Sequence, residues 1–99
     1  MDDIKHYQFF RQLEDLSFVQ SIILYGSRSQ GDNAPRADID LAINCPKAND
    51  NDWSTILDIV ENADTLLKID CVRFDRLSDS NPLKINISKQ GVTIYDRND

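Results

Sequence analysis

The sequence predicts an α/β (α+β) fold, a small mixed β-sheet with helices packed on it. Segments with helical periodicity alternate along the chain with short apolar segments typical of strands, in the order α-β-(turn)-β-α-β-α-β. The chain has 99 residues, of which 40% are hydrophobic, and this suits one modest core. We therefore expect residues 1–99 to form a single domain.

The first half of the chain is predicted to contain one helix and two strands. Residues 3–16 carry apolar side chains on one helical arc: Tyr7, Phe9, Phe10, Leu13 and Leu16. Residues 21–25 form an apolar run, which is typical of a strand covered on both faces. Residues 38–43 alternate between apolar and polar positions, so this strand buries one side and presents Asp38 and Asp40 on the other.

A helix and a third strand are predicted next. Asp52 is the expected N-cap of a helix that runs to about Ala63, because its carboxylate can accept hydrogen bonds from the amides of the first turn. The helix carries one apolar stripe: Trp53, Ile56, Leu57, Val60 and Ala63. Residues 68–74 are predicted to form a strand, with Asp70 on one face and Cys71 on the other.

The chain is predicted to end with a short helix and a fourth strand. Asn81 and Pro82 open the helix, since proline is favoured at the first helical position, and Gly91 lies just past its end. Residues 92–95 form the strand, and residues 96–99 are expected to be a frayed polar tail.

The composition excludes several classes of protein. The chain has 11 Lys and Arg against 17 Asp and Glu, a net charge of −6, which argues against direct nucleic-acid binding because that affinity comes from cations that neutralise phosphates. No window has the roughly 18 consecutive apolar residues of a membrane span, and no signal pattern opens the chain, so we expect a cytoplasmic protein with no membrane contact. Cys45 and Cys71 are too few for a disulfide scaffold and too far apart for a zinc clip, so we expect two reduced thiols.

The turn-prone segment after residue 25 has the features of a phosphate-binding loop. Gly26 follows the end of a predicted strand, where glycine permits a positive φ and lets a ligand approach the backbone. Ser27 is expected to begin a short helical turn, whose amides together with the hydroxyl bind an anion. Arg28 and Arg36 could add positive charge at the phosphates.

The carboxylates after this loop indicate a metal site. Asp38 and Asp40 project from one face of a strand, and like charges this close raise one pKa unless a cation is present. Magnesium suits them, because it prefers oxygen ligands and bridges carboxylates to substrate phosphates. Asp70 could complete a site for two magnesium ions, about 3.5–4 Å apart, which would stabilise both the attacking and the leaving oxygens at phosphorus.

The identity of the third carboxylate is open between three residues. Asp70 is favoured by the phase of its strand, and Asp64 and Asp75 are nearby alternatives. If Asp70 lies beside the metal, it is also the natural general base, because it can reach the hydroxyl of the acceptor.

Taken together, these residues resemble a known family. Gly26-Ser27, ten residues, Asp38-x-Asp40 and the later strand acid Asp70 are similar to the pattern of the minimal nucleotidyltransferases. These belong to the DNA polymerase beta-like nucleotidyltransferase superfamily. The resemblance extends from about residue 19 to residue 95, and its most specific part is GSRSQGDNAPRADIDLA.

The resemblance implies a palm-like nucleotidyltransferase core and a role for each matching residue. Gly26 and Ser27 match the pair that holds the β- and γ-phosphates of the incoming nucleotide, ATP, and Arg28 matches a frequent but less specific basic position. The carboxylates of Asp38 and Asp40 match the ligands of both magnesium ions, and Asp70 matches the third carboxylate.

The resemblance also implies a partner protein. Larger members carry further helical domains for the acceptor, whereas these 99 residues match the palm-like core, so we expect the acceptor to come from another chain or to bind an open face. Minimal members are typically encoded beside a helical-bundle protein of the HEPN type. Such a pair acts as a two-component nucleotidyltransferase, or as a toxin–antitoxin system in which AMP from ATP is placed on a tyrosine of the HEPN ribonuclease.

Two other functions remain open at this point. The first is a binding module that neutralises a partner toxin by occlusion without catalysis, which the small size and acidic balance of the chain would suit. The second is nucleotidyl transfer to a small molecule such as an aminoglycoside.

Overall fold

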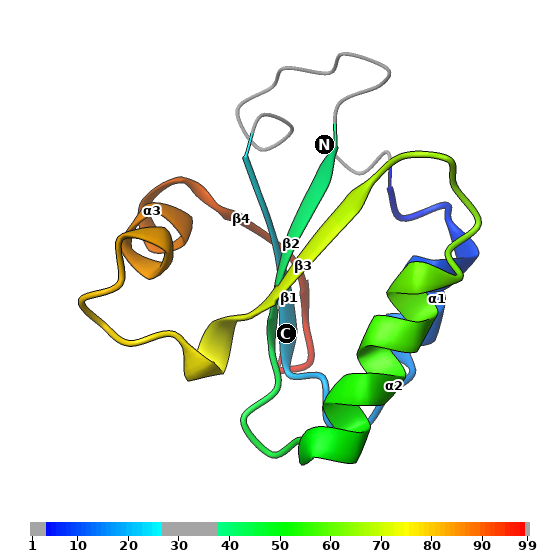
Figure 1. Cartoon of the computed structure of the whole chain (residues 1–99), viewed down its shortest axis with the longest axis horizontal. Helices are drawn as coiled ribbons and strands as arrows, with labels where there is room; N and C mark the ends of the chain where they lie inside the picture. Colours follow the sequence, from blue (N-terminus) through cyan, green and yellow to red (C-terminus); the bar gives the residue numbers. More distant parts are fainter. Residues whose placement is uncertain (1–3, 27–37, 99) are drawn as a thin grey trace.

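The computed structural model describes residues 4–26 and 38–98. Within these residues, one four-stranded sheet has the strand order β3-β2-β1-β4 (Figure 1). The strands are β1 (Ser21–Tyr25), β2 (Ile39–Asn44), β3 (Ile69–Arg73) and β4 (Val92–Asp96). Strand β1 runs antiparallel to both β2 and β4, whereas β2 and β3 are parallel. The predicted small mixed sheet is therefore confirmed.

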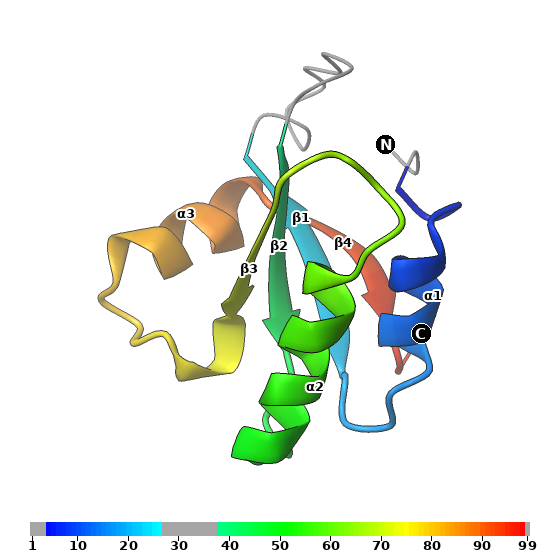
Figure 2. The same ribbon diagram turned by 45° about the vertical axis from the view of Figure 1, so that its right-hand side comes forward.

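Helices lie on both faces of this sheet. Helices α1 (Gln8–Glu14) and α2 (Asp50–Glu61) cover one face, and α3 (Pro82–Gln90) lies on the other (Figure 2). A short 3-10 turn, η2 (Phe74–Arg76), follows β3. None of the helices in the described ranges combines the length and apolar character that a membrane crossing requires.

The core lies between the sheet and helices α1 and α2. Its fully buried side chains come from alternate strand positions and from both helices: Phe9, Phe10, Leu13, Ile22, Leu24, Ile39, Leu41, Ile43 and Ile56. The predicted burial of Ile39, Leu41 and Ile43 is thus confirmed, and Asp40 lies half-buried on the opposite face. The alternation is incomplete, because Ala42 on that face is also fully buried. Strand β1 differs from the prediction of two-sided burial, because Ile23 and Tyr25 are only half-buried on that opposite face.

Helix α1 is shorter than the helix predicted over residues 3–16, because its amino end is capped from elsewhere in the chain. Tyr7 has an extended backbone (φ −71°, ψ 142°) and makes no capping hydrogen bond with its side chain. Instead, the carboxylate of Asp64 accepts hydrogen bonds from the backbone N–H groups of Gln8 (2.9 Å) and Phe9 (3.0 Å). Asp64 therefore satisfies two of the unpaired amides at the start of α1 and connects this helix to the segment after α2.

The predicted N-cap is wrong for α2 and confirmed for α3. The N-cap of α2 is Asn49 and not Asp52, since the Asn49 side chain accepts from the Asp52 N–H (2.8 Å) and the Asp52 carboxylate accepts from the Asn49 N–H (3.0 Å). This reciprocal pair is a capping box, in which an acidic residue at the third position supports the cap. Helix α3 begins as predicted, with Asn81 as the cap and Pro82 in the first turn.

The carboxyl-terminal segment is more ordered than the predicted frayed tail. Strand β4 extends to Asp96, one residue further than expected. Arg97 then donates hydrogen bonds from its guanidinium to the carbonyl oxygens of Val19 (2.9 Å) and Leu16 (2.7 Å). These bonds attach the end of the chain to the connection between α1 and β1.

The capping role of Asp64 predicts a pH-dependent contribution to stability. We expect Asp64→Ala to lower the melting temperature at pH 7, because two amides of α1 lose their partner. Hydrogen bonds from Gln8 and Phe9 lower the pKa of Asp64. Its stabilisation is therefore present above the carboxylate's unfolded pKa of about 4 and is lost as pH falls through the lower folded value.

Thermal unfolding of wild type and variant from pH 7 to pH 2 measures this effect. The difference in melting temperature should shrink as the solution becomes acidic. Asp58→Ala, at an exposed position of α2, is the matched control and should leave the melting temperature nearly unchanged or slightly higher. An equal loss in both variants would contradict the capping role.

Candidate active site

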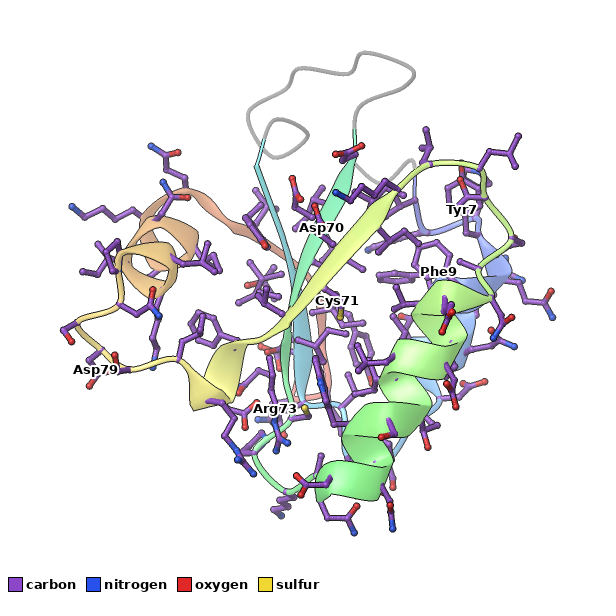
Figure 3. The ribbon with its side chains drawn as sticks, in the orientation of Figure 1. Tyr7, Phe9, Asp70, Cys71, Arg73 and Asp79 are labelled. Atoms are coloured by element: carbon purple, nitrogen blue, oxygen red, sulfur yellow. The ribbon has the colours of Figure 1, made fainter. Side chains whose placement is uncertain are left out.

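A row of three side chains crosses the sheet on the face opposite the main core. Tyr25 of β1 pairs in register with Asp40 of β2, and Asp40 pairs in register with Asp70 of β3. Residues in register on neighbouring strands point to the same face, about 4.8 Å apart. The row lies where β1 ends and where β2 and β3 begin, and Figure 3 shows Asp70 at this end of β3. The sheet itself therefore places two carboxyl groups side by side.

The two carboxyl groups interact unfavourably when both are ionised. The pKa of Asp40 is raised, first by burial, then by the negative charges of Asp70 and Asp38, and by a hydrogen bond between the carboxyl groups of Asp40 and Asp70. The positive charge of Lys68 opposes this shift. A divalent cation would remove the repulsion and favour the ionised form, so the chemistry of this pair fits a metal ligand set.

Gly26 provides the space that the Asp40 carboxylate occupies. Gly26 has a φ of 77°, a left-handed conformation that glycine adopts without a steric penalty. A Cβ atom at this position would collide with Oδ2 of Asp40. The predicted positive φ of Gly26 is thus confirmed. In this structure, the group that closely approaches the Gly26 backbone is the Asp40 carboxylate. Ser27 and Arg28, predicted to bind phosphate, lie outside the described residues, as does Arg36.

Asp38 lies at the edge of this row of side chains. We call Asp38, Asp40 and Asp70 the carboxylate row. It directly precedes β2 and its side chain is exposed. It lines a surface hollow of about 490 Å³ together with Leu66, Leu67 and Lys68. The hollow thus extends from the site to the loop before β3.

The two alternatives to Asp70 have other partners. Asp64 caps α1, as described above. Asp75 accepts a hydrogen bond from the Cys45 N–H (2.9 Å) and pairs with Nε of Arg73 (3.1 Å). Burial alone would raise the pKa of Asp75, but these hydrogen bonds and the guanidinium charge outweigh it and lower the pKa. Of the three acids, Asp70 is therefore the one that the sheet register places beside Asp40.

The donor atoms fit magnesium better than a softer metal. Asp40 and Asp70 offer hard carboxylate oxygens, which magnesium prefers, and Asp38 is two residues from Asp40. Within residues 4–26 and 38–98, no three or more His, Cys, Asp or Glu side chains are grouped closely enough to hold a metal ion together. The described part of the site is thus a carboxylate pair.

The cysteines do not contribute a nucleophile. Cys45 and Cys71 are free thiols, as predicted, and Cys45 is fully buried. Burial raises the pKa of Cys45 to about 11 and that of Cys71 to about 12. Both thiols are therefore protonated at neutral pH, and the protonated thiol is a poor nucleophile.

Two residues beside the carboxylates were not predicted from the sequence. The pKa of Tyr25 is raised by burial and then by the charges of Asp40 and Asp70, which places its phenol within their electrostatic reach. Nζ of Lys68 lies 3.8 Å from Oδ1 of Asp70. The signal that identifies both residues is the register of the three strands, which the sequence pattern alone does not provide.

Comparison with known proteins identifies the class. A family model described as polymerase beta, nucleotidyltransferase matches residues 8–99, so the chain belongs to this family. It is therefore a nucleotidyltransferase, and the predicted resemblance is confirmed. A search of curated proteins finds no match.

Similar solved structures are toxin–antitoxin proteins. A chain of a toxin–antitoxin crystallised with AMP-PNP is 22% identical, with a TM-score of 0.64 over 89% of this chain and 71% of that chain. Chains of two mutants of the toxin–antitoxin MntA–HpeT are 25% and 21% identical, with TM-scores of 0.61 and 0.56 over 90% of this chain and 68% of those chains. The fold is thus shared with proteins of this kind, as expected for a minimal nucleotidyltransferase.

The contact between Gly26 and Asp40 predicts a coupled effect on stability. We expect Gly26→Ala to destabilise the fold by about 1–2 kcal/mol from the left-handed backbone alone, and by more because the new methyl group collides with the Asp40 carboxylate. In an Asp40→Ala background the collision is absent, so Gly26→Ala should cost only the backbone term. Urea unfolding of the four proteins measures this coupling, and additive effects would contradict it.

The repulsion at Asp40 predicts that a site mutation stabilises the metal-free protein. Ionising Asp40 is less favourable in the folded chain than in the unfolded chain, because its folded pKa is raised. We therefore expect Asp40→Asn to raise the melting temperature at pH 7 in EDTA. Asp58→Asn, at an exposed site on α2, is the control for the lost charge. A lower melting temperature for Asp40→Asn would show that the carboxylate supports the fold.

Proposed function

We propose that residues 1–99 act as a single, cytoplasmic, magnesium-dependent adenylyltransferase domain. The domain would move AMP from ATP to a tyrosine hydroxyl of a HEPN-type helical-bundle protein. In this role it is the antitoxin, or the catalytic subunit, of a two-protein system. The observation that carries the proposal is the in-register pair of Asp40 and Asp70 beside the bare backbone of Gly26.

The proposed mechanism assigns each residue a separate task. Asp38, Asp40 and Asp70 would hold two magnesium ions, which when bound supply positive charge to the phosphates. Gly26 and Ser27 would hold the β- and γ-phosphates, and Arg28 would add charge there.

The bond changes of the transfer are those of a displacement at phosphorus. The hydroxyl oxygen of the acceptor forms a bond to the α-phosphorus, and the bond from that phosphorus to the pyrophosphate oxygen breaks. Asp70 would accept the hydroxyl proton, because its side chain is 47% exposed at the start of β3 and is accessible to an acceptor. Pyrophosphate would then leave as the second product.

Three observations support a protein acceptor and ATP. The similar structures are toxin–antitoxin proteins, and one of them was crystallised with AMP-PNP. The carboxylate row is open at the sheet end, with Asp38 exposed and Asp70 about half exposed, so a protein side chain can reach it. The net charge of −6 disfavours a nucleic-acid acceptor.

Loss of transfer in carboxylate variants tests this proposal. The chain is mixed with a HEPN-type helical-bundle protein, magnesium and ATP labelled in its α-phosphate. We expect Asp70→Asn to lower the rate of label transfer about 10²- to 10⁴-fold, the range for loss of a general base, and Asp40→Asn to lower it at least as much. Asp58→Asn is the folded control with the same charge change. Equal rates in all four proteins would contradict the proposal.

The same preparation separates transfer from occlusion. If an Asp38→Asn, Asp40→Asn double variant binds the partner and still silences it fully, the chain acts by occlusion. If binding persists while silencing fails, the transfer reaction is responsible. Label that appears only on an added aminoglycoside, and not on the partner, would instead identify a small-molecule acceptor.

A further inference from the structure

We infer that Lys68 is a built-in counter-cation of the carboxylate row, and that a divalent cation binds by displacing its ammonium group from Asp70. This inference rests on the proposed function, because it takes Asp40 and Asp70 as ligands of the metal. It adds a residue outside the family pattern to the site, and it assigns that residue a role before the metal arrives.

The backbone fixes Lys68 beside all three acids. Lys68 directly precedes β3 and lies two residues before Asp70, so the two side chains leave the strand on the same side. The carbonyl oxygen of Lys68 accepts a hydrogen bond from the N–H of Ile39 (2.9 Å), the residue between Asp38 and Asp40. The parallel pairing of β2 and β3 therefore holds the Lys68 backbone in place beside β2, while its side chain is 70% exposed.

The charge of Lys68 acts on the row in the way expected of a counter-ion. Its Nζ is 3.8 Å from Oδ1 of Asp70, and its charge opposes the shift that Asp70 and Asp38 impose on Asp40. It also lines the hollow that contains Asp38. One ammonium group thus acts on both Asp40 and Asp70, and it lines the same hollow as Asp38.

The same contact is weak enough to be displaced. A charge-assisted hydrogen bond between nitrogen and oxygen is about 2.7–2.9 Å long, whereas this contact is 3.8 Å. The side chains of Lys68 and Asp70 are 70% and 47% exposed, and water-exposed pairs of this kind contribute little. The flexible stem of lysine lets the ammonium move away without any change in the backbone.

Other ion pairs of the described residues are built differently. The Arg73–Asp75 pair is largely shielded from solvent, with side chains 8% and 11% exposed, and Arg73 also donates to the carbonyl oxygens of Cys45 and Ala48. That pair is a fixed part of the fold. Within residues 4–26 and 38–98, the Lys68 ammonium makes no side-chain hydrogen bond of this kind, which suits an exchangeable cation.

Metal affinity without nucleotide or partner tests the inference. Binding of manganese, a probe for the magnesium site, is measured by electron paramagnetic resonance or calorimetry. We expect Lys68→Met to bind manganese about three- to tenfold more tightly than wild type, since a competing positive charge near the ion is removed. Lys68→Arg, which keeps the charge, should remain within about twofold of wild type by the same reasoning.

Lys47→Met is the matched control for net charge. Lys47 is exposed in the loop after β2, at the end of this strand opposite Asp40, and its removal gives the same change in total charge. Its effect on manganese affinity should be clearly smaller than that of Lys68→Met. In EDTA, Lys68→Met should have the lower melting temperature of the two, and saturating manganese should raise its melting temperature more than that of wild type.

The outcomes separate this inference from the proposed function. The metal site is supported if wild type binds manganese and Asp40→Asn does not. If, in that case, Lys68→Met has the same affinity as Lys47→Met, or binds manganese more weakly than wild type, the proposed role of Lys68 is wrong. If wild type itself does not bind manganese, both the metal site and the counter-cation are wrong. Lys68→Gln repeats the measurement with a polar side chain, so that a local packing effect of methionine is recognised.

Discussion

The register between β2 and β3 is the constraint on which the candidate site depends. Asp40 and Asp70 are adjacent because two parallel strands pair at these two residues, and a slip by one residue would turn one carboxylate into the core. The apolar side chains on the other face of β2 prevent such a slip, since Ile39 and Leu41 are fully buried in the core. The apolar core thus holds two like charges together that would otherwise separate.

The aspartates of this chain have different roles because different groups surround their carboxylates. Asp64 and Asp75 receive backbone hydrogen bonds, which lower their pKa values and make them parts of the fold. Asp40 faces another carboxyl group, and its pKa is raised. A carboxyl group whose pKa is raised by burial and by neighbouring acids at a sheet end has the character of a functional group, since perturbed pKa values cluster at such sites. The direction of the pKa shift therefore separates the structural acids from the candidate ligand.

The sequence predicted those features that depend on local pattern. Alternation over residues 38–43 was sufficient to place Asp40 opposite the core, and Gly26 after an apolar strand was sufficient for a positive φ. Contacts between distant segments were not predictable in this way. The amides of α1 that Asp64 caps lie 56 and 55 residues from it in the sequence, so neither the late start of α1 nor the capping by Asp64 follows from periodicity. Lys68 was likewise overlooked, because its importance comes from strand pairing.

The excess of negative charge determines how a nucleotide can be received. A triphosphate that approaches the carboxylate row meets Asp38, Asp40 and Asp70, and Lys68 offsets one of these three charges at most. Repulsion between the phosphates and the row is therefore strong in the absence of further cations, and the low dielectric near the half-buried Asp40 increases it. Divalent ions, as in the proposed function, would reverse the sign of this interaction, because each would bring two positive charges to oxygens that already lie side by side. The acidic character of the chain is then compatible with the proposed use of ATP, since the metal would supply much of the attraction for the phosphates.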